Sequence, residues 1–218
     1  MRTDKKYIRL VLKRLSKRYG AHPHTQLSSD NICELFVAVF LSPQCTDAQV
    51  NKSTVRLFRK FRAFQDYANA DLRTLTRCLS GLNYYKTKAK HLKRAAAMIN
   101  SRFGGKIPQT IKELMELPGV GRKVANVILN EGYAINEGIA VDTHCARVSK
   151  RIGLTAHSDP IKIERDLLNK IPKHEWGRTS NLLISLGRDT CKARNKECSR
   201  CILKDVCPSS DVVHGLQV

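Results

Sequence analysis

Apolar residues recur at helical spacing along nearly the whole chain, and this pattern constrains the fold most. Two series show it clearly: Ile8, Val11, Leu12, Leu15 and Tyr19, then Tyr85, Ala89, Leu92, Ala96, Ile99 and Phe103. Side chains at steps of three and four lie on one face of an α-helix, whereas a half-buried strand needs strict alternation. No stretch alternates convincingly. The sequence therefore predicts an all-α fold.

Residues that start and stop helices divide this pattern into segments. Glycines end helices, and Asp, Asn or Thr side chains cap their first turns. On this basis we expect helices over about 1–20, 31–41 (capped by Asp30 or Asn31), 46–61, 71–81, 85–103 and 111–115, one that runs through 124–128, one that follows Asp142, and two over about 160–169 and 176–186. The second is apolar nearly all round and should lie at the centre of a core.

Positive charge dominates the composition. The 218 residues include 39 Lys and Arg against 19 Asp and Glu, a net charge of +20. Such an excess indicates a polyanionic partner, of which nucleic acid is the first candidate. Residues 84–106 contain seven basic residues and no acid, so this face either follows phosphates or is simply solvated. No apolar run is long enough to cross a bilayer and no secretory signal begins the chain, so we expect no membrane association and a cytoplasmic location.

The segment 117–121, Leu-Pro-Gly-Val-Gly, predicts a tight turn between two helices. Glycines at 119 and 121 let the backbone turn and present N–H groups at a helix N-terminus, where an anion is favoured. Gly119 and Gly121 are therefore candidate DNA-phosphate contacts, which position a duplex without reading its sequence. A plain helical turn is the alternative.

Lys123 and Asp142 are the candidate catalytic residues. Lys123 follows the glycine turn in the first turn of a helix, where the helix dipole and desolvation favour the neutral, nucleophilic amine. The alternative is a phosphate-binding lysine. Asp142 ends a short apolar run and starts a helix, so it is at least an N-cap, a role compatible with facing a reaction centre.

Four of the eight cysteines, Cys191, Cys198, Cys201 and Cys207, follow the spacing C-x6-C-x2-C-x5-C. In a chain without a secretory signal, such a cluster indicates a metal site rather than disulfides. Four thiolates suit zinc as well as an iron–sulfur cluster, so the spacing leaves both open. Basic residues between these cysteines, among them Lys192 and Arg194, are candidate phosphate contacts.

These motifs together resemble the helix–hairpin–helix DNA glycosylases, and among them the endonuclease III family. The resemblance rests on residues 117–123, residues 141–144 and the cysteine spacing, and it extends from Leu35 to Cys207. It implies two helical lobes: a six-helix domain over 22–135 containing the hairpin, and a cluster domain built from 1–21 plus 136–218. It also implies that the four cysteines hold a [4Fe-4S] cluster.

The resemblance implies a bifunctional enzyme of base excision repair. Lys123 would displace an oxidised pyrimidine, form a Schiff base with the sugar and cleave 3′ to the abasic site by β-elimination, while Asp142 assists. Gln44 and Leu82 match family residues that enter the helix when a base is flipped out, and His144 belongs to the Asp motif as a DNA contact. The expected partner is double-stranded DNA with damaged pyrimidines or abasic sites, bound by a monomer near the nucleoid of a prokaryote.

Two departures from the bacterial pattern affect substrate choice. Pro43 and Cys45 flank Gln44, and residues 83–86 form a longer loop that is similar to the loop of adenine and thymine mismatch glycosylases. A mismatch enzyme acting on thymine or uracil opposite guanine is therefore the nearest rival, although Lys123 favours the bifunctional interpretation. A non-catalytic DNA-binding protein and a zinc-ribbon RNA-binding protein are the rivals from other classes.

Overall fold

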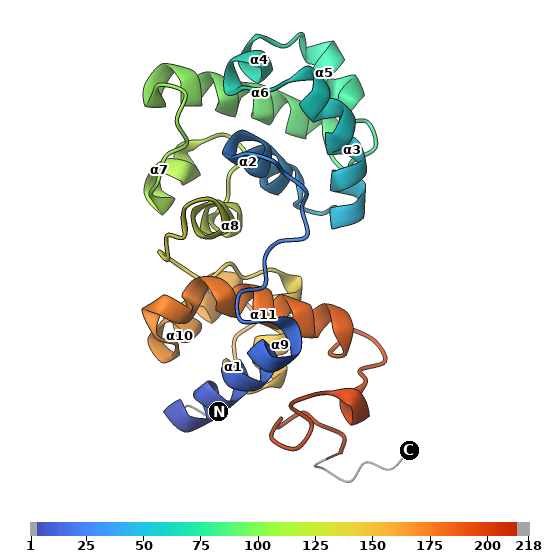
Figure 1. The fold of residues 1–218 in the computed structure, drawn as a ribbon, viewed down its shortest axis with the longest axis vertical. Coiled ribbons are helices and arrows are strands. Elements are labelled where there is room, and N and C mark those ends of the chain that lie inside the picture. The colour runs from blue at the N-terminus through green and yellow to red at the C-terminus, as the bar shows by residue number, and fades with distance from the viewer. Residues whose placement is uncertain (1–3, 213–218) are drawn as a thin grey trace. The chain divides into compact units, whose positions relative to one another are not determined.

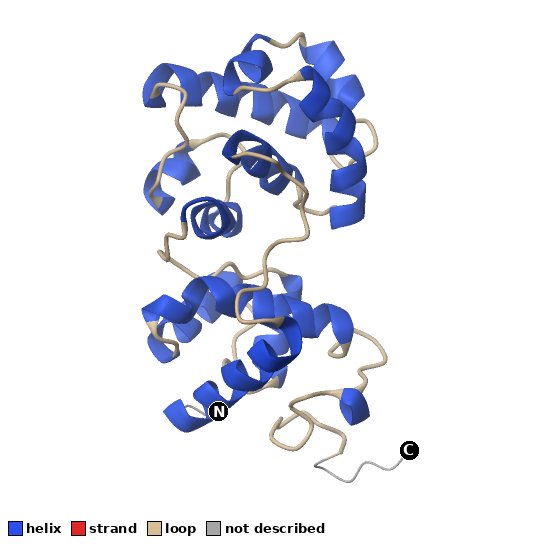
Figure 2. Cartoon of the chain, viewed as in Figure 1, coloured by secondary structure: helices blue, strands red, loops and turns tan. Residues whose placement is uncertain are grey.

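The computed structural model describes residues 4–212, and within them it contains helices and no strand (Figures 1 and 2). The all-α prediction is confirmed. The helices are α1 (Lys5–Tyr19), α2 (Ile32–Leu41), α3 (Asp47–Lys60), α4 (Phe64–Asn69), α5 (Leu72–Cys78), α6 (Tyr85–Phe103), α7 (Ile111–Glu116), α8 (Arg122–Tyr133), α9 (Thr143–Arg151), α10 (Pro160–Lys170) and α11 (Trp176–Asp189). Short 3₁₀ turns cover Lys173–Glu175 and Cys198–Arg200.

Side-chain caps explain where most of these helices begin. Each cap accepts a hydrogen bond from a backbone N–H of the first turn, which would otherwise have no helical partner. The capping residues are Asp4, Asn31, Thr46, Asp71, Thr110, Asp142 and Asp159. The helix starts predicted at Asn31, Thr46, Asp71 and Asp142 are therefore confirmed.

The helix α4 (Phe64–Asn69) was not predicted. This six-residue helix is too short for a periodic pattern, and its N-cap, Ala63, has no side chain that accepts a hydrogen bond. Instead Asp66 accepts from the N–H groups of Arg62 (2.7 Å) and Ala63 (3.0 Å), and these bonds hold the pKa of the Asp66 carboxyl below its usual value. With α4, the part of the chain from α2 to α8 contains seven helices rather than the six expected.

The chain divides into two compact units. Unit 1 combines residues 1–25 with 136–218, and unit 2 is the continuous segment 26–135. Unit 1 is therefore built from both ends of the sequence, and α1 packs on α11 within it.

Unit 2 is organised around α2, which lies between α6 and α8 (Figure 1). Every residue from Leu35 to Leu41 is buried. The Phe36 ring stacks on Phe40 with 6.0 Å between ring centroids and meets Phe64 of α4 edge-on at 5.3 Å. The apolar segment predicted to be central is indeed the core helix of this unit.

In unit 1, the apolar stripe of α1 is buried against the second half of the chain. Leu15 is fully buried in a cluster that includes Val148 of α9 and Leu182 of α11. The Tyr7 hydroxyl donates to the carbonyl oxygen of Ile152 over 2.7 Å, a buried bond that fixes α1 to the end of α9. This packing gives α9, which begins at Asp142, a rigid support.

Candidate functional site

The glycine turn joins α7 to α8 as a helical hairpin. The N–H of Val120 donates to the carbonyl of Leu117 (3.0 Å), and both side chains are buried beneath the turn. Gly119 has φ +87°, and a Cβ there would lie 2.9 Å from Cζ of Phe40. Gly121 has φ −95° and open space around a hypothetical Cβ. The turn therefore requires glycine at 119, whereas at 121 glycine leaves the N-terminus of α8 accessible.

Lys123 is half-buried in the first turn of α8, followed by the buried residues Val124 and Ala125. The positive end of the helix dipole lies at this turn, and it disfavours an additional positive charge on the lysine. This environment suits an amine that must react in its neutral form.

Asp142 is the N-cap of α9, with its Oδ1 accepting from the N–H of Cys145 over 2.7 Å. Its carboxylate is half-buried, and burial of Cys145 beneath it raises the pKa of that thiol to about 12. His144, two residues after Asp142, has its Nδ1 3.2 Å from a guanidinium nitrogen of Arg147. Lys123 belongs to unit 2 and Asp142 to unit 1, and their opposition across a DNA groove stays a prediction.

Two loops of unit 2 carry the residues expected to enter DNA. Gln44 is exposed and has φ +58°, a left-handed conformation that is unusual for glutamine. Leu82 is only 3% exposed and belongs to the core of the unit, so any entry into DNA would require it to leave that core. Tyr84 is the prominent side chain of the same loop, 66% exposed and also left-handed, with φ +56°. Sequence reasoning did not single out Tyr84.

The four spaced cysteines line one pocket, together with apolar side chains that include Ile152, Leu186 and Leu203. No group of three or more His, Cys, Asp or Glu side chains that could hold a metal ion is found between residues 4 and 212. Four thiols that line one pocket form a donor set that suits a zinc ion as well as an iron–sulfur cluster.

Two arginines of α9 hold the first part of the cysteine loop. Arg147 Nε donates to the carbonyl of Cys191 (3.1 Å). Arg151 donates to the carbonyls of Lys192 (2.6 Å) and Ala193 (3.2 Å), and lies 3.4 Å from Sγ of Cys191. The sequence did not identify these arginines, because their partners are 40 or more residues away along the chain. They connect the cysteine pocket to the helix that begins at Asp142.

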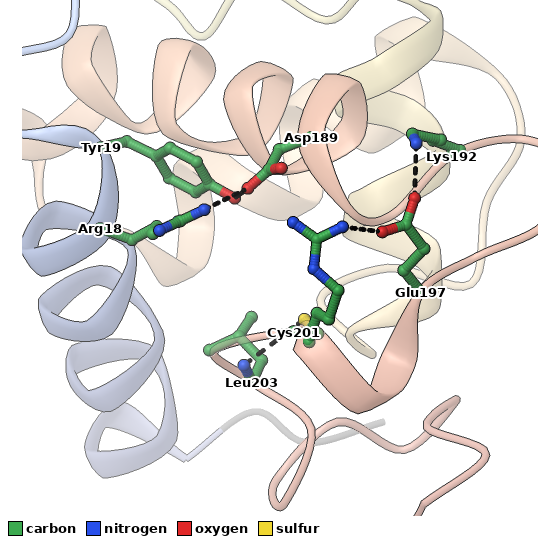
Figure 3. A network of polar contacts seen from close by, with 8 residues as sticks. Arg18, Tyr19, Asp189, Lys192, Glu197, Cys201 and Leu203 are labelled. Carbon is green, nitrogen blue, oxygen red and sulfur yellow. Dashed lines mark hydrogen bonds and ion pairs between the residues drawn. The ribbon is translucent and has the colours of Figure 1, made fainter.

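Polar contacts fix the rest of this loop (Figure 3). Glu197 pairs with Lys192 and with Arg200, and the N–H of Leu203 points at Sγ of Cys201 over 3.5 Å. Lys192 is still exposed despite its partner, as is Arg194. Both remain accessible to a phosphate.

On the adjoining helices, the Tyr19 hydroxyl donates to Asp189 over 2.9 Å, and burial with this carboxylate raises the pKa of Tyr19 (Figure 3). Arg14 forms an ion pair with Asp205, which holds the pKa of Asp205 below its usual value. Both contacts tie α1 to the C-terminal part of unit 1.

This combination of hairpin, lysine and cysteine pocket agrees with comparisons to known proteins. Residues 37–173 match the model of the HhH-GPD superfamily of base excision DNA repair proteins. Endonuclease III of Bacillus subtilis strain 168 is 41% identical over 187 residues, covering 85% of each chain, and that of Synechocystis is 40% identical over 205 residues, covering 93% and 91%. A solved structure, a trapped endonuclease III–DNA covalent intermediate with an estranged adenine, has a TM-score of 0.88 at 40% identity over 94% of this chain and 96% of that one.

The chain therefore belongs to the endonuclease III family within this superfamily. The predicted function class, a DNA glycosylase and abasic-site lyase of base excision repair, is confirmed. Within the described residues, no helix is both long and apolar enough to cross a membrane.

Proposed function

We propose that the chain excises oxidised pyrimidines from double-stranded DNA and cleaves 3′ to the resulting abasic site, with Lys123 as the nucleophile. The observation that carries this proposal is the position of Lys123 in the first turn of α8, directly after the Gly119–Gly121 turn. The chain is also 40% identical to an endonuclease III whose covalent intermediate with DNA has been trapped. The domain assignment goes with it: a hairpin domain over 22–135 and a cluster domain over 1–21 plus 136–218.

In this mechanism the neutral amine of Lys123 attacks C1′ of the damaged nucleotide as the bond to the base breaks. The sugar ring opens to give an imine between the lysine and C1′. Loss of a proton from C2′ then expels the 3′ phosphate, which is the β-elimination step. The Asp142 carboxylate, held by its bond to the N–H of Cys145, stabilises positive charge developing on the sugar or accepts the proton from the lysine.

We propose that Cys191, Cys198, Cys201 and Cys207 hold a [4Fe-4S] cluster, because all four line one pocket. The cluster supplies a structural link between segments of the loop. Arg147 and Arg151 orient that loop from α9, and Lys192 and Arg194 contact phosphates from it.

DNA binding would draw on both units. The backbone N–H groups at Gly119 and Gly121 donate to a DNA phosphate, and His144 contacts the DNA backbone from α9. Gln44 fills the gap left by the flipped nucleotide, joined by Leu82 if its loop rearranges. The protein acts as a monomer, and we place it in the cytoplasm with the nucleoid.

Borohydride trapping on a duplex containing thymine glycol tests this function. Wild-type protein should form a covalent adduct, Lys123→Ala should form none, and Lys112→Ala, an exposed lysine of the same hairpin, should behave as wild type. Absence of an adduct from folded wild-type protein would reject the lysine mechanism.

The second candidate is excision of thymine or uracil opposite guanine, favoured by the resemblance of segment 83–86 to mismatch glycosylases and by the exposure of Tyr84 within it. Residues 85 and 86 of this segment belong to α6 rather than to the loop that was expected. A panel of duplexes with oxidised pyrimidines and G·T or G·U mismatches separates the two. Preference for a mismatch would replace the oxidised-pyrimidine assignment.

A further inference from the structure

Lys88 is a buried lysine near the start of α6, with only 9% of its surface exposed. Its Nζ lies 2.8 Å from the carbonyl oxygen of Leu41, 2.8 Å from that of Pro43 and 3.0 Å from Sγ of Cys45. A lysine has up to three N–H donors, so these partners match its full capacity. The proposed reaction gives this side chain no task.

All three partners of Lys88 belong to the segment around Gln44. The Cys45 N–H donates to the carbonyl of Ser42 (3.0 Å), which closes a four-residue turn over 42–45 with Pro43 and Gln44 at its centre. Proline suits the first central position of such a turn, but the positive φ of Gln44 at the second favours glycine or asparagine. The 42–45 turn therefore holds glutamine in a backbone state that persists only when surrounding contacts impose it.

A second contact fixes the same turn from the neighbouring loop. The Asn83 side chain donates to the carbonyl oxygen of Gln44 itself over 2.6 Å. Lys88 therefore binds two carbonyl oxygens that precede Gln44 and the thiol of Cys45 that follows it, while Asn83 binds the carbonyl oxygen of Gln44 itself. The Gln44 side chain remains exposed.

We propose that Lys88 is a positioning residue for base excision, which holds the 42–45 turn so that the Gln44 side chain points in one direction before DNA arrives. Pre-organisation removes the cost of ordering Gln44 when it enters the duplex. This inference rests on the proposed function, because it assumes that Gln44 fills the gap left by the flipped base.

The chain provides a matched control in Lys93, five residues further along α6. Lys93 Nζ donates to the carbonyls of Ala68 (2.7 Å) and Ala70 (2.6 Å). It therefore binds carbonyl oxygens at the C-terminal end of α4, as Lys88 does at the C-terminal end of α2. Lys93→Met removes an equivalent lysine–carbonyl clamp without touching the 42–45 turn. It measures how loss of a lysine–carbonyl contact affects the folding and activity of unit 2 in general.

The experiment compares Lys88→Met, Lys88→Arg and Lys93→Met in the full cluster-containing protein. Two substrates are used: a duplex with thymine glycol, and a duplex whose preformed abasic site lies opposite a gap, where no base has to leave the stack. We expect Lys88→Met to lower kcat/KM on thymine glycol by roughly 10- to 100-fold, since a misplacement of about 1 Å has effects of this size. Borohydride trapping at the abasic site should be unchanged, Lys88→Arg should restore excision, and Lys93→Met should resemble wild type.

A double-mutant cycle with Gln44→Ala identifies the route of the effect. If Lys88 acts through Gln44, the double variant Lys88→Met with Gln44→Ala should be no slower than Gln44→Ala alone. Three results would overturn the inference. They are additive losses of kcat/KM in the double variant, equal losses of activity on the two substrates, and wild-type excision by folded Lys88→Met. If Lys88→Met does not fold, Asn83→Ala is used in its place, because Asn83 is exposed and its side chain donates to the same turn. This variant should show the same substrate selectivity. Wild-type protein that forms no adduct would instead reject the proposed function.

Discussion

The Phe40 ring lies directly beneath Gly119, so that a Cβ on Gly119 would lie 2.9 Å from Cζ of Phe40 and 3.1 Å from Cβ of His91. The core helix of unit 2 and the hairpin turn are therefore in contact at a point where only a hydrogen atom fits. The turn is shaped by the core beneath it, and the two glycines of the turn have different roles.

Gly119→Ala should destabilise the protein, because it adds both a clash with Phe40 and a strained positive φ. We expect a loss of about 1–3 kcal/mol, measured by urea unfolding. Gly121→Ala has neither problem and should change stability by less than about 0.5 kcal/mol. Its methyl group lies beside the N-terminus of α8, however, so DNA binding should weaken. Equal stability of the two variants would contradict this division of roles.

Asp142→Asn should separate capping from catalysis. Asparagine caps helices about as well as aspartate, so the melting temperature should change little. Loss of the carboxylate should lower excision by about 100-fold or more if the charge acts in the reaction. Asp159→Asn makes the same chemical change at the N-cap of α10 and serves as the control. If Asp142→Asn excises bases as the wild type does, the role of Asp142 is only to cap α9.

Removal of the proposed cluster should release the cysteine loop. After oxidative loss of iron, Cys191, Cys198, Cys201 and Cys207 should react with iodoacetamide, whereas Cys145 should not, because burial raises the pKa of its thiol to about 12. Peptide mass spectrometry gives the labelled positions. As a second test, Cys198→Ser should abolish the brown colour of the protein and Cys78→Ser should preserve it. Retention of one zinc per chain in place of iron would contradict the cluster assignment.

Ala134 ends α8 in a left-handed conformation, with φ +54°. Glycine is favoured at such a position, so Ala134→Gly should stabilise the protein by about 1 kcal/mol. Gln44 has the same backbone state, and Gln44→Gly should be more stable than Gln44→Ala by a similar amount of about 1 kcal/mol. Thermal melts compare these pairs. A destabilising Ala134→Gly would show that this backbone state carries no strain.

Local signals predicted the helices other than α4, whereas contacts distant in sequence decided the details of the candidate site. The caps at Asn31, Thr46 and Asp142 could be found because a cap and its helix are adjacent in the chain. The burial of Leu82 could not, because a loop leucine carries no local mark of whether it faces the core or solvent. The partners of Lys88 and Arg151 lie more than 40 residues away, and a lysine or arginine that binds carbonyl oxygens has the same local sequence as one in solvent.

Unit 1 takes its first helix from the beginning of the chain and the rest from residue 136 onward. A ribosome therefore completes α1 and all of unit 2 before any partner of α1 exists. During that interval Tyr7, Ile8, Val11, Leu12 and Leu15, all buried in the finished protein, have nothing of their own unit to cover them. The nascent chain carries these five apolar side chains uncovered through most of its synthesis, and unit 1 is the last part of the protein that can fold.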